Sequence, residues 1–185
     1  MSTELRNFLS LSYDELEQLN LKAKEQRKNR VAAHKIQEER IKYLTDEKGI
    51  KAVTVLFSDL EGRLHMLDYD KKFLVKSWDN LTFDGSSIRG FTAQRESDLR
   101  LGMDWGSFYW APADVFGSGK VLVFGEVIDK DGSPYSADTR GLLKGFADTL
   151  NKREGYTLNA ANEMFEAIGG DRKSLKVLTD TQKSV

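Results

Sequence analysis

The fold is decided by residues 51–67, which read KAVTVLFSDLEGRLHML. The run 53–57 is β-branched and aromatic, residues 59–62 have the composition of a turn, and residues 63–67 return to alternating apolar side chains. β-branched and aromatic residues favour strands, and a short polar segment between two such runs is typical of a hairpin. The sequence therefore predicts an antiparallel β-hairpin here.

More strands and a helix are expected after this hairpin. Residues 121–128 are almost continuously apolar, which predicts a strand buried on both faces, and residues 129–132 are a strong turn signal. Asp138 is the expected N-cap of a helix. The apolar residues of that helix recur at helical spacing: Leu142, Leu143, Phe146, Ala147 and Leu150. Strands followed by packed helices give an α+β fold class.

The first 48 residues contain no Gly and no Pro and are expected to be helical. Ser12 and Glu15 have capping-box spacing, and Lys48 followed by Gly49 suggests a cationic last turn with a left-handed cap. The pattern is compatible with one helix over about 13–47 and with a helical hairpin broken near Asn29.

Composition narrows the function classes. The chain has 185 residues, 28 Lys and Arg against 29 Asp and Glu, a net charge of -1 and no Cys. Balanced charge argues against a nucleic-acid partner, and the basic cluster at 22–30 is interpreted as a solvated helix face. The lack of Cys excludes thiolate chemistry. No apolar run approaches a membrane span and the N-terminus is acidic, so we expect a cytoplasmic protein with no membrane partner.

The most specific motif is FDGSSIRGF at 83–91, followed by ESDLRL at 96–101. Taken alone, Asp-Gly-Ser-Ser is more often a structural turn than an active site. The neighbouring charges and the second Gly favour a functional loop. Two His residues complete the candidates: His65 is expected to be a packed or surface strand residue, and His34 to be exposed.

From Val53 to about Asn162 the chain resembles bacterial glutamine synthetase. The motifs that carry this resemblance keep the family's order and spacing: DLEGR at 59–63, FDGSS at 83–87 with ESD at 96–98, PADVFGSGKV at 112–121, and DTRGLLK at 138–144. The resemblance implies a helical N-terminal extension (1–48), a β-grasp domain (49–135) and the start of a catalytic domain (136–185). The expected fold is a β-grasp-like sheet between the helical arm and a C-terminal helix of an incomplete catalytic domain.

The resemblance also implies an activity, the ATP-dependent ligation of ammonia to glutamate through γ-glutamyl phosphate, with Mg²⁺ or Mn²⁺. In that family the loop Asp binds ammonium, takes its proton and reaches into the neighbouring subunit's site. Asp84 would have this role, with Gly85, Ser86 and Ser87 forming the ammonium loop. A carboxylate both holds the cation and eases removal of its proton. Glutamate, ammonia and a homo-oligomer are the implied partners.

The resemblance ends near residue 163. The family places a Glu-x-Glu metal pair there, whereas this chain has Glu163 and Glu166, whose spacing directs them to opposite faces of a strand. Glu163 is retained as a candidate match to the first metal ligand. We expect a truncated product, such as a frameshift near Glu163, that is inactive alone. Leu142, Leu143, Phe146 and Leu150 would then be exposed and would promote self-association or instability.

Three functions stay open at this point. The first is a glutamine synthetase, or a related ligase joining glutamate to another amine. The second is a non-enzymatic module that occupies a subunit interface of a full-length homologue. The third is an unrelated β-grasp interaction module.

Overall fold

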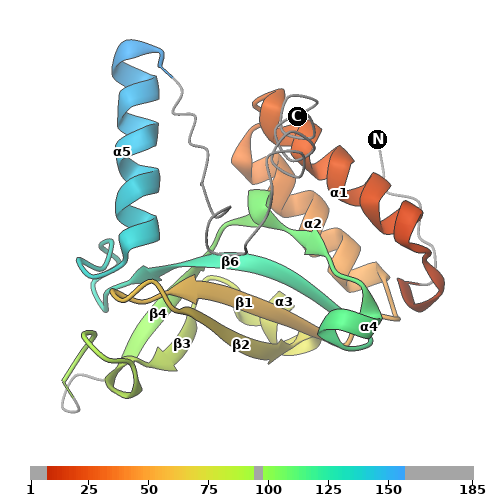
Figure 1. Cartoon of the computed structure of the whole chain (residues 1–185), viewed down its shortest axis with the longest axis horizontal. Coiled ribbons are helices and arrows are strands. Elements are labelled where there is room, and N and C mark those ends of the chain that lie inside the picture. The colour runs from red at the N-terminus through yellow and green to blue at the C-terminus, as the bar shows by residue number, and fades with distance from the viewer. Residues whose placement is uncertain (1–7, 94–97, 157–185) are drawn as a thin grey trace, which may run out of the picture. The chain divides into compact units, whose positions relative to one another are not determined.

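The computed structural model describes residues 8–93 and 98–156, and its contacts divide the chain into two compact units, residues 1–146 and 147–185. Figure 1 shows two N-terminal helices followed by a curved sheet. The elements in chain order are η1 (Phe8–Ser10), α1 (Tyr13–Lys28), α2 (Ala33–Asp46), β1 (Ala52–Ser58), β2 (Leu64–Asp70), α3 (Lys71–Ser77), β3 (Leu81–Asp84), η2 (Gly85–Ser87), β4 (Asp98–Met103), η4 (Trp105–Ser107), β5 (Tyr109–Trp110), α4 (Ala113–Phe116), β6 (Lys120–Ile128) and α5 (Thr139–Glu154).

The sheet is mixed, with strand order β2-β1-β6-β4-β3 and with β5 paired to β6. β1 runs antiparallel to β2 and parallel to β6, and the β1–β2 register aligns Phe57 with His65. β1 pairs with the first half of β6, whereas β4 pairs with its second half. The predicted hairpin and the α+β fold class are confirmed.

Burial in β6 changes along the strand. Val121, Leu122 and Val123 are buried in succession, as predicted for a strand covered on both faces, and burial then alternates up to Ile128. The first part of the strand therefore lies in the centre of the sheet with side chains packed on both faces, and only this part fits the prediction.

The N-terminal segment is two helices, so the helical hairpin is the correct alternative. α1 ends at Lys28, Asn29 is its C-cap, and Arg30 adopts a positive φ of 53°. The predicted capping box is present, because Ser12 Oγ accepts from Glu15 N and the Glu15 carboxylate accepts from Ser12 N.

The predicted end of the second helix was wrong. α2 ends at Asp46 without a basic residue in its last turn, and Glu47 is the C-cap in an extended conformation. Gly49 is not among the residues with positive φ. Its N–H instead donates to Glu47 Oε1 at 2.8 Å, so a carboxylate closes this connection where a left-handed glycine was expected.

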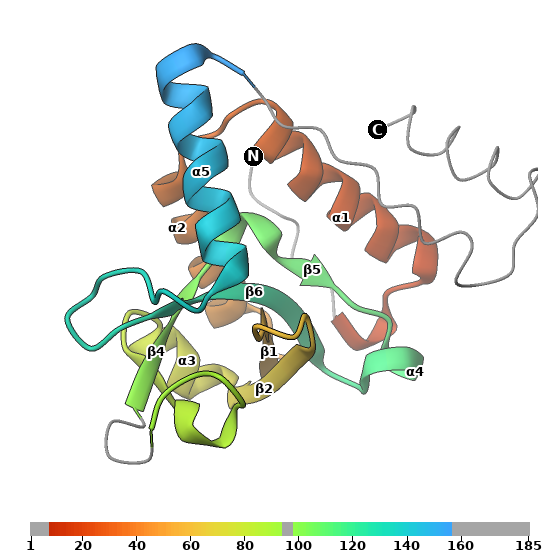
Figure 2. The same cartoon turned by 60° about the vertical axis from the view of Figure 1, so that its left-hand side comes forward.

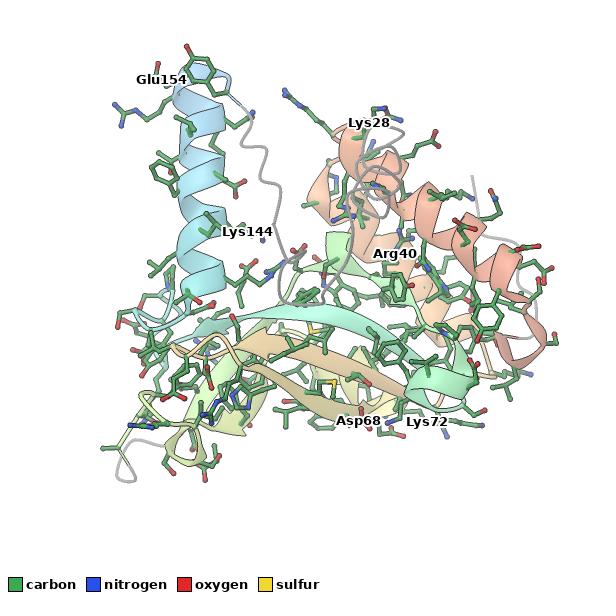
Figure 3. The ribbon with its side chains drawn as sticks, in the orientation of Figure 1. Lys28, Arg40, Asp68, Lys72, Lys144 and Glu154 are labelled. Carbon is green, nitrogen blue, oxygen red and sulfur yellow. The ribbon has the colours of Figure 1, made fainter. Side chains whose placement is uncertain are left out.

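Two interactions attach the helices to the sheet. The Asn20 side chain donates to Trp110 O at 3.0 Å and accepts from Trp110 N at 2.9 Å, which joins α1 to both polar groups of one β5 residue. Arg40 of α2 is buried, and its guanidinium carbon lies 5.0 Å from the centre of the Trp110 ring. Figure 3 shows Arg40 between the helices and the sheet. Burial lowers the pKa of Arg40, and Gln26 and Glu39 accept its hydrogen bonds.

Asp138 lies at the predicted N-cap position, and its carbonyl accepts from Leu142 N. Its carboxylate is buried and accepts from Val127 N at 2.8 Å, which ties the start of α5 to β6. Arg140 and Lys144, one turn apart, both contact Glu126 of β6. Figure 2 shows the start of α5 next to the end of β6.

The first turns of α5 expose large apolar side chains. Leu142, Leu143 and Phe146 are 55%, 63% and 60% exposed, as expected from the sequence. In the second unit, Leu150 is half-buried and therefore differs from that expectation. None of the helices among residues 8–93 and 98–156 is long and apolar enough to cross a membrane.

Replacing Asn20 by Ala tests how the helical arm is held. Loss of both hydrogen bonds leaves the Trp110 main-chain groups without their partner, so Asn20→Ala is expected to lower the free energy of unfolding by about 1–3 kcal/mol. Urea denaturation followed by Trp fluorescence measures this loss. Gln18→Ala, which removes an exposed amide from the same helix, is the control and is expected to change little. Equal stability of the two variants would show that the Asn20 hydrogen bonds to Trp110 do not hold the helical arm.

Candidate functional site

The candidate loop begins where β3 ends. Asp84 is the last residue of β3 and is exposed, and residues 85–87 form the single turn η2. The Asp84 carboxylate accepts from Ser86 N at 2.9 Å and from Ser86 Oγ at 2.6 Å. Ser87 Oγ donates to the Asp84 carbonyl at 2.8 Å. Ser86 therefore orients the carboxylate, and Ser87 fixes the main chain beneath it.

These bonds set the charge of Asp84. The hydrogen bonds from the Ser86 hydroxyl and then the Ser86 N–H lower the pKa of the Asp84 carboxyl below its ordinary value. Hydrogen bonds to a carboxylate favour its charged form. Asp84 therefore presents a fixed negative charge to solvent at neutral pH.

Gly85 allows the turn to lie against the sheet. It is buried, and a Cβ atom there would lie 2.7 Å from Leu99 Cδ1 and 2.9 Å from Thr92 Oγ1. Both distances are shorter than packed atoms tolerate, so only glycine permits this approach. Ile88, buried just after the turn, anchors its other end.

A second carboxylate lies opposite Asp84. The register of β3 and β4 pairs Asp84 with Asp98, and both residues are exposed. Directly opposed residues on antiparallel strands have neighbouring side chains. Strand register therefore brings a second acidic residue to the end of β3.

The β1–β2 turn has its own network next to this loop. Asp59 is buried, and its Oδ1 accepts from Glu61 N and Arg63 N, each at 2.9 Å. His65 Nε2 lies 2.8 Å from Asp59 Oδ2. The hydrogen bond from His65, followed by those of the main chain, lowers the pKa of Asp59. The Asp59 carboxylate thus stabilises the turn by hydrogen bonds to residues within the turn and after it.

Phe57 connects this turn to the Asp84 loop. Its buried ring stacks on His65 with 5.3 Å between ring centres, and it lies 4.9 Å from the ring of Phe83, the residue before Asp84. Glu61 adds an ion pair with Arg89 at 3.2 Å on the far side of the loop. The loop is therefore held at both ends by the hairpin.

The described residues contain no group of three His, Asp or Glu side chains that could hold a metal ion. Glu163, the candidate ligand from the sequence, lies outside the described residues. His65 is occupied by Asp59, and His34 is exposed, as expected.

Residues 49–130 match the family model described as the β-grasp domain of glutamine synthetase. These residues are a β-grasp domain of the glutamine synthetase family. The chain is 37% identical over 144 residues to the glutamine synthetase of Clostridium saccharobutylicum, covering 75% of this chain and 31% of that protein. It is 33% identical over 127 residues to the enzyme of Thermotoga maritima, covering 68% of this chain and 29% of that protein. The chain thus spans about three tenths of these relatives.

Solved structures agree on the fold. A glutamine synthetase of Plasmodium falciparum superposes with a TM-score of 0.55 at 20% identity, covering 62% of this chain and 22% of that one. The ligand-free form of a protein named GmaS superposes with a TM-score of 0.52 at 18% identity, covering 60% of this chain and 26% of that one. At this identity the likeness shows the shared β-grasp architecture.

Three pairings around the loop of this glutamine synthetase domain were not predicted from the sequence. Asp98 was noted as a nearby charge, but its pairing with Asp84 depends on strand register. The Asp59–His65 contact could have been found from the hairpin, since six residues across a tight turn return to the same end of the strands. Nothing local signals the Glu61–Arg89 pair, because it joins two separate loops.

Gly85→Ala tests the close approach in the glutamine synthetase loop. The added methyl group overlaps Leu99, so the variant is expected to lose about 1–3 kcal/mol of unfolding free energy. Gly145→Ala is the control, because a Cβ there meets nothing within 4 Å and alanine favours a helix over glycine by up to about 1 kcal/mol. In thermal and urea unfolding, Gly85→Ala should lower the free energy of unfolding and Gly145→Ala should raise it. A Gly85→Ala variant more stable than the wild type would refute the close packing of Gly85 against Leu99.

Asp59→Asn tests the β1–β2 turn through pH. Because the pKa of Asp59 is lower in the folded chain than in the unfolded chain, its contribution is fully present above the unfolded value of about 3.9. That contribution is lost as the pH falls through the folded value. The stability difference between the wild type and Asp59→Asn should therefore be larger at neutral pH than at about pH 3. Exposed Asp79, changed to Asn, is the control, and a difference independent of pH would contradict the expectation.

Proposed function

We propose that this chain supplies the ammonium loop of a cytoplasmic glutamine synthetase, in the ATP-dependent ligation of ammonia to glutamate through γ-glutamyl phosphate. The observation that carries the proposal is the Asp84 carboxylate, exposed and oriented by Ser86 at the end of β3 in a domain of this family. The assignment of Asp84, Gly85, Ser86 and Ser87 to the reaction is part of the proposal.

The chemistry follows from the charge and position of Asp84. Ammonium cannot attack an acyl phosphate while its nitrogen carries four protons. Asp84 is exposed and its pKa is lowered, so its carboxylate is ionised and can attract ammonium. Asp84 takes one proton from ammonium and passes it to solvent, which leaves ammonia with a free lone pair. Ammonia then bonds to the γ-carbon, phosphate leaves, and the nitrogen releases a second proton to phosphate or solvent, which gives the amide.

Exposure of Asp84 supports a role across a subunit boundary. Its carboxylate bonds only within its own turn and leaves one oxygen, Oδ2, without a partner among the described residues. A neighbouring protomer could therefore contact it without breaking the turn. Glutamate, ATP and Mg²⁺ or Mn²⁺ would bind in the portion of the family that the chain does not span.

A chimera tests the proposal. Residues 49–156 of this chain replace the matched segment of the Thermotoga maritima enzyme, and product formation is measured with ammonia and with methylamine. Asp84→Asn in this chimera is expected to lower kcat about 100-fold or more, the usual contribution of general acid–base catalysis. Comparison of the two amines reports which one the loop favours.

Asp79→Asn is the matched control, because Asp79 is an exposed carboxylate that lies outside the loop. It should leave kcat and the assembly state unchanged, and Asp84→Asn should leave the thermal midpoint unchanged. If Asp84→Asn kept full turnover, or lost fold and turnover together, Asp84 would have no role in the reaction.

A second role is favoured by the exposed apolar residues of α5, Leu142, Leu143 and Phe146. Such a surface suits a module that occupies a subunit interface of a full-length homologue. Assayed by itself with ATP, glutamate and hydroxylamine, the 185-residue chain is expected to form no γ-glutamyl hydroxamate. Copurification with a full-length glutamine synthetase, together with a change in its activity, would favour this second role.

A further inference from the structure

A groove separate from the Asp84 loop lies between the end of α2, the connection to β1, and α3. Its volume is about 490 Å³, within the range of roughly 300–1,000 Å³ typical of small-molecule sites. Its walls come from two segments of the first unit, residues 44–51 and 70–76, and α2 packs directly against α3. The groove is therefore part of the folded domain.

Five lysines line this groove: Lys48, Lys51, Lys71, Lys72 and Lys76. No described residue forms an ion pair with any of the five. By contrast, three lysines elsewhere, Lys42, Lys120 and Lys144, pair with carboxylates. Lys72, labelled in Figure 3, is exposed at the start of α3.

The acidic groups near the groove are already occupied. Asp70 lines it, and its Oδ1 accepts from Phe73 N at 3.0 Å as the N-cap of α3. Glu47 accepts from Gly49 N through its side chain and from Lys71 Nζ through its carbonyl. The lining therefore keeps a clear excess of positive charge.

The ammonium groups influence one another. Burial lowers the pKa of Lys71, and the nearby charges of Lys51 and Lys72 lower it further, against the opposing effect of Glu47 and Asp70. Folding thus brings like charges together, which costs free energy that a bound anion would offset. Lys51 and Lys72 are thus near enough to Lys71 for their charges to act on it.

The floor of the groove is apolar. Leu44 and Ile50 are fully buried beneath it, and Val75 of α3 is half-buried at its side. A small inorganic anion would use only the lysine rim. Leu44 and Ile50 are 0% and 1% exposed, so the apolar surface that a ligand can reach is Val75 and the alkyl chains of the lysines. A ligand with both an anionic group and an apolar body can use this surface together with the ammonium groups.

We propose that this groove binds a small phosphorylated molecule with an aromatic or aliphatic body. The phosphate contacts the lysine rim, with Lys51 and Lys72 next to Lys71, and the apolar body lies on Val75 and on the alkyl chains of the lysines. This inference goes beyond the ligation reaction, since none of these residues belongs to the Asp84 loop. The site is suited to regulation of the domain by a metabolite.

Titration of the full 185-residue chain with 1-naphthyl phosphate tests the inference, using backbone amide NMR at moderate ionic strength. The probe should shift the amides of Leu44, Ile50 and Val75. Its dissociation constant should be about tenfold or more below those of inorganic phosphate and of 1-naphthol. Equal affinity for the probe and for either fragment would overturn the proposal, as would shifts that map elsewhere.

Two triple variants show whether binding depends on the lysines of the groove or on the positive charge of the surface in general. The triple variant Lys48→Gln, Lys51→Gln, Lys72→Gln should raise the dissociation constant of 1-naphthyl phosphate about tenfold or more. The control triple Lys22→Gln, Lys28→Gln, Lys35→Gln removes the same charge from the exposed faces of α1 and α2 and should change it less than about twofold. Equal effects of the two triples would overturn the proposal.

Two further measurements make the result decisive. Val75→Ser should weaken binding of 1-naphthyl phosphate and leave that of inorganic phosphate unchanged. A short oligonucleotide that bound more tightly than the probe, and lost affinity in the groove triple, would make this a polyanion surface and refute a small-molecule site. The mapping with the wild-type chain decides the proposal even where a variant fails to fold.

Discussion

The contact of Gly85 with Leu99 is the constraint on which the candidate site depends. Because no side chain fits at this position, the turn after β3 can lie against β4, and Asp84 is left at the edge of the sheet. Ser86 can then reach back to the Asp84 carboxylate with both its N–H and its hydroxyl. The close approach of Gly85 to Leu99 thereby leaves the Asp84 carboxylate exposed, oriented and ionised.

The hairpin that defines the fold also supports this loop. Phe57 packs between His65 and Phe83, and Asp59 holds the turn that carries Glu61 to Arg89. The helical arm is attached elsewhere, to β5 through Asn20, and Asp84 is exposed at the edge of the sheet. The same sheet thus separates a loop suited to subunit contact from a lysine groove between α2 and α3.

The features that sequence predicted correctly are local. The hairpin, the capping box of Ser12 and Glu15 and the start of α5 each depend on residues within a few positions of one another. The features it missed require distant partners. Gly49 was expected to cap α2 in a left-handed conformation, whereas Glu47 closes that connection, and the Asp138 carboxylate bonds to Val127 eleven residues away. At the site, residue types pointed to the loop, but only strand register brings Asp98 opposite Asp84.

The most direct test is the titration of the Asp84 carboxyl carbon by NMR in the full 185-residue chain, with and without ammonium chloride. The account predicts a pKa below the ordinary value of about 3.9, a return toward that value in Ser86→Ala, and a shift of the Asp84 signal on adding ammonium that sodium does not produce. A pKa at or above the ordinary value, unaffected by Ser86→Ala, would contradict it.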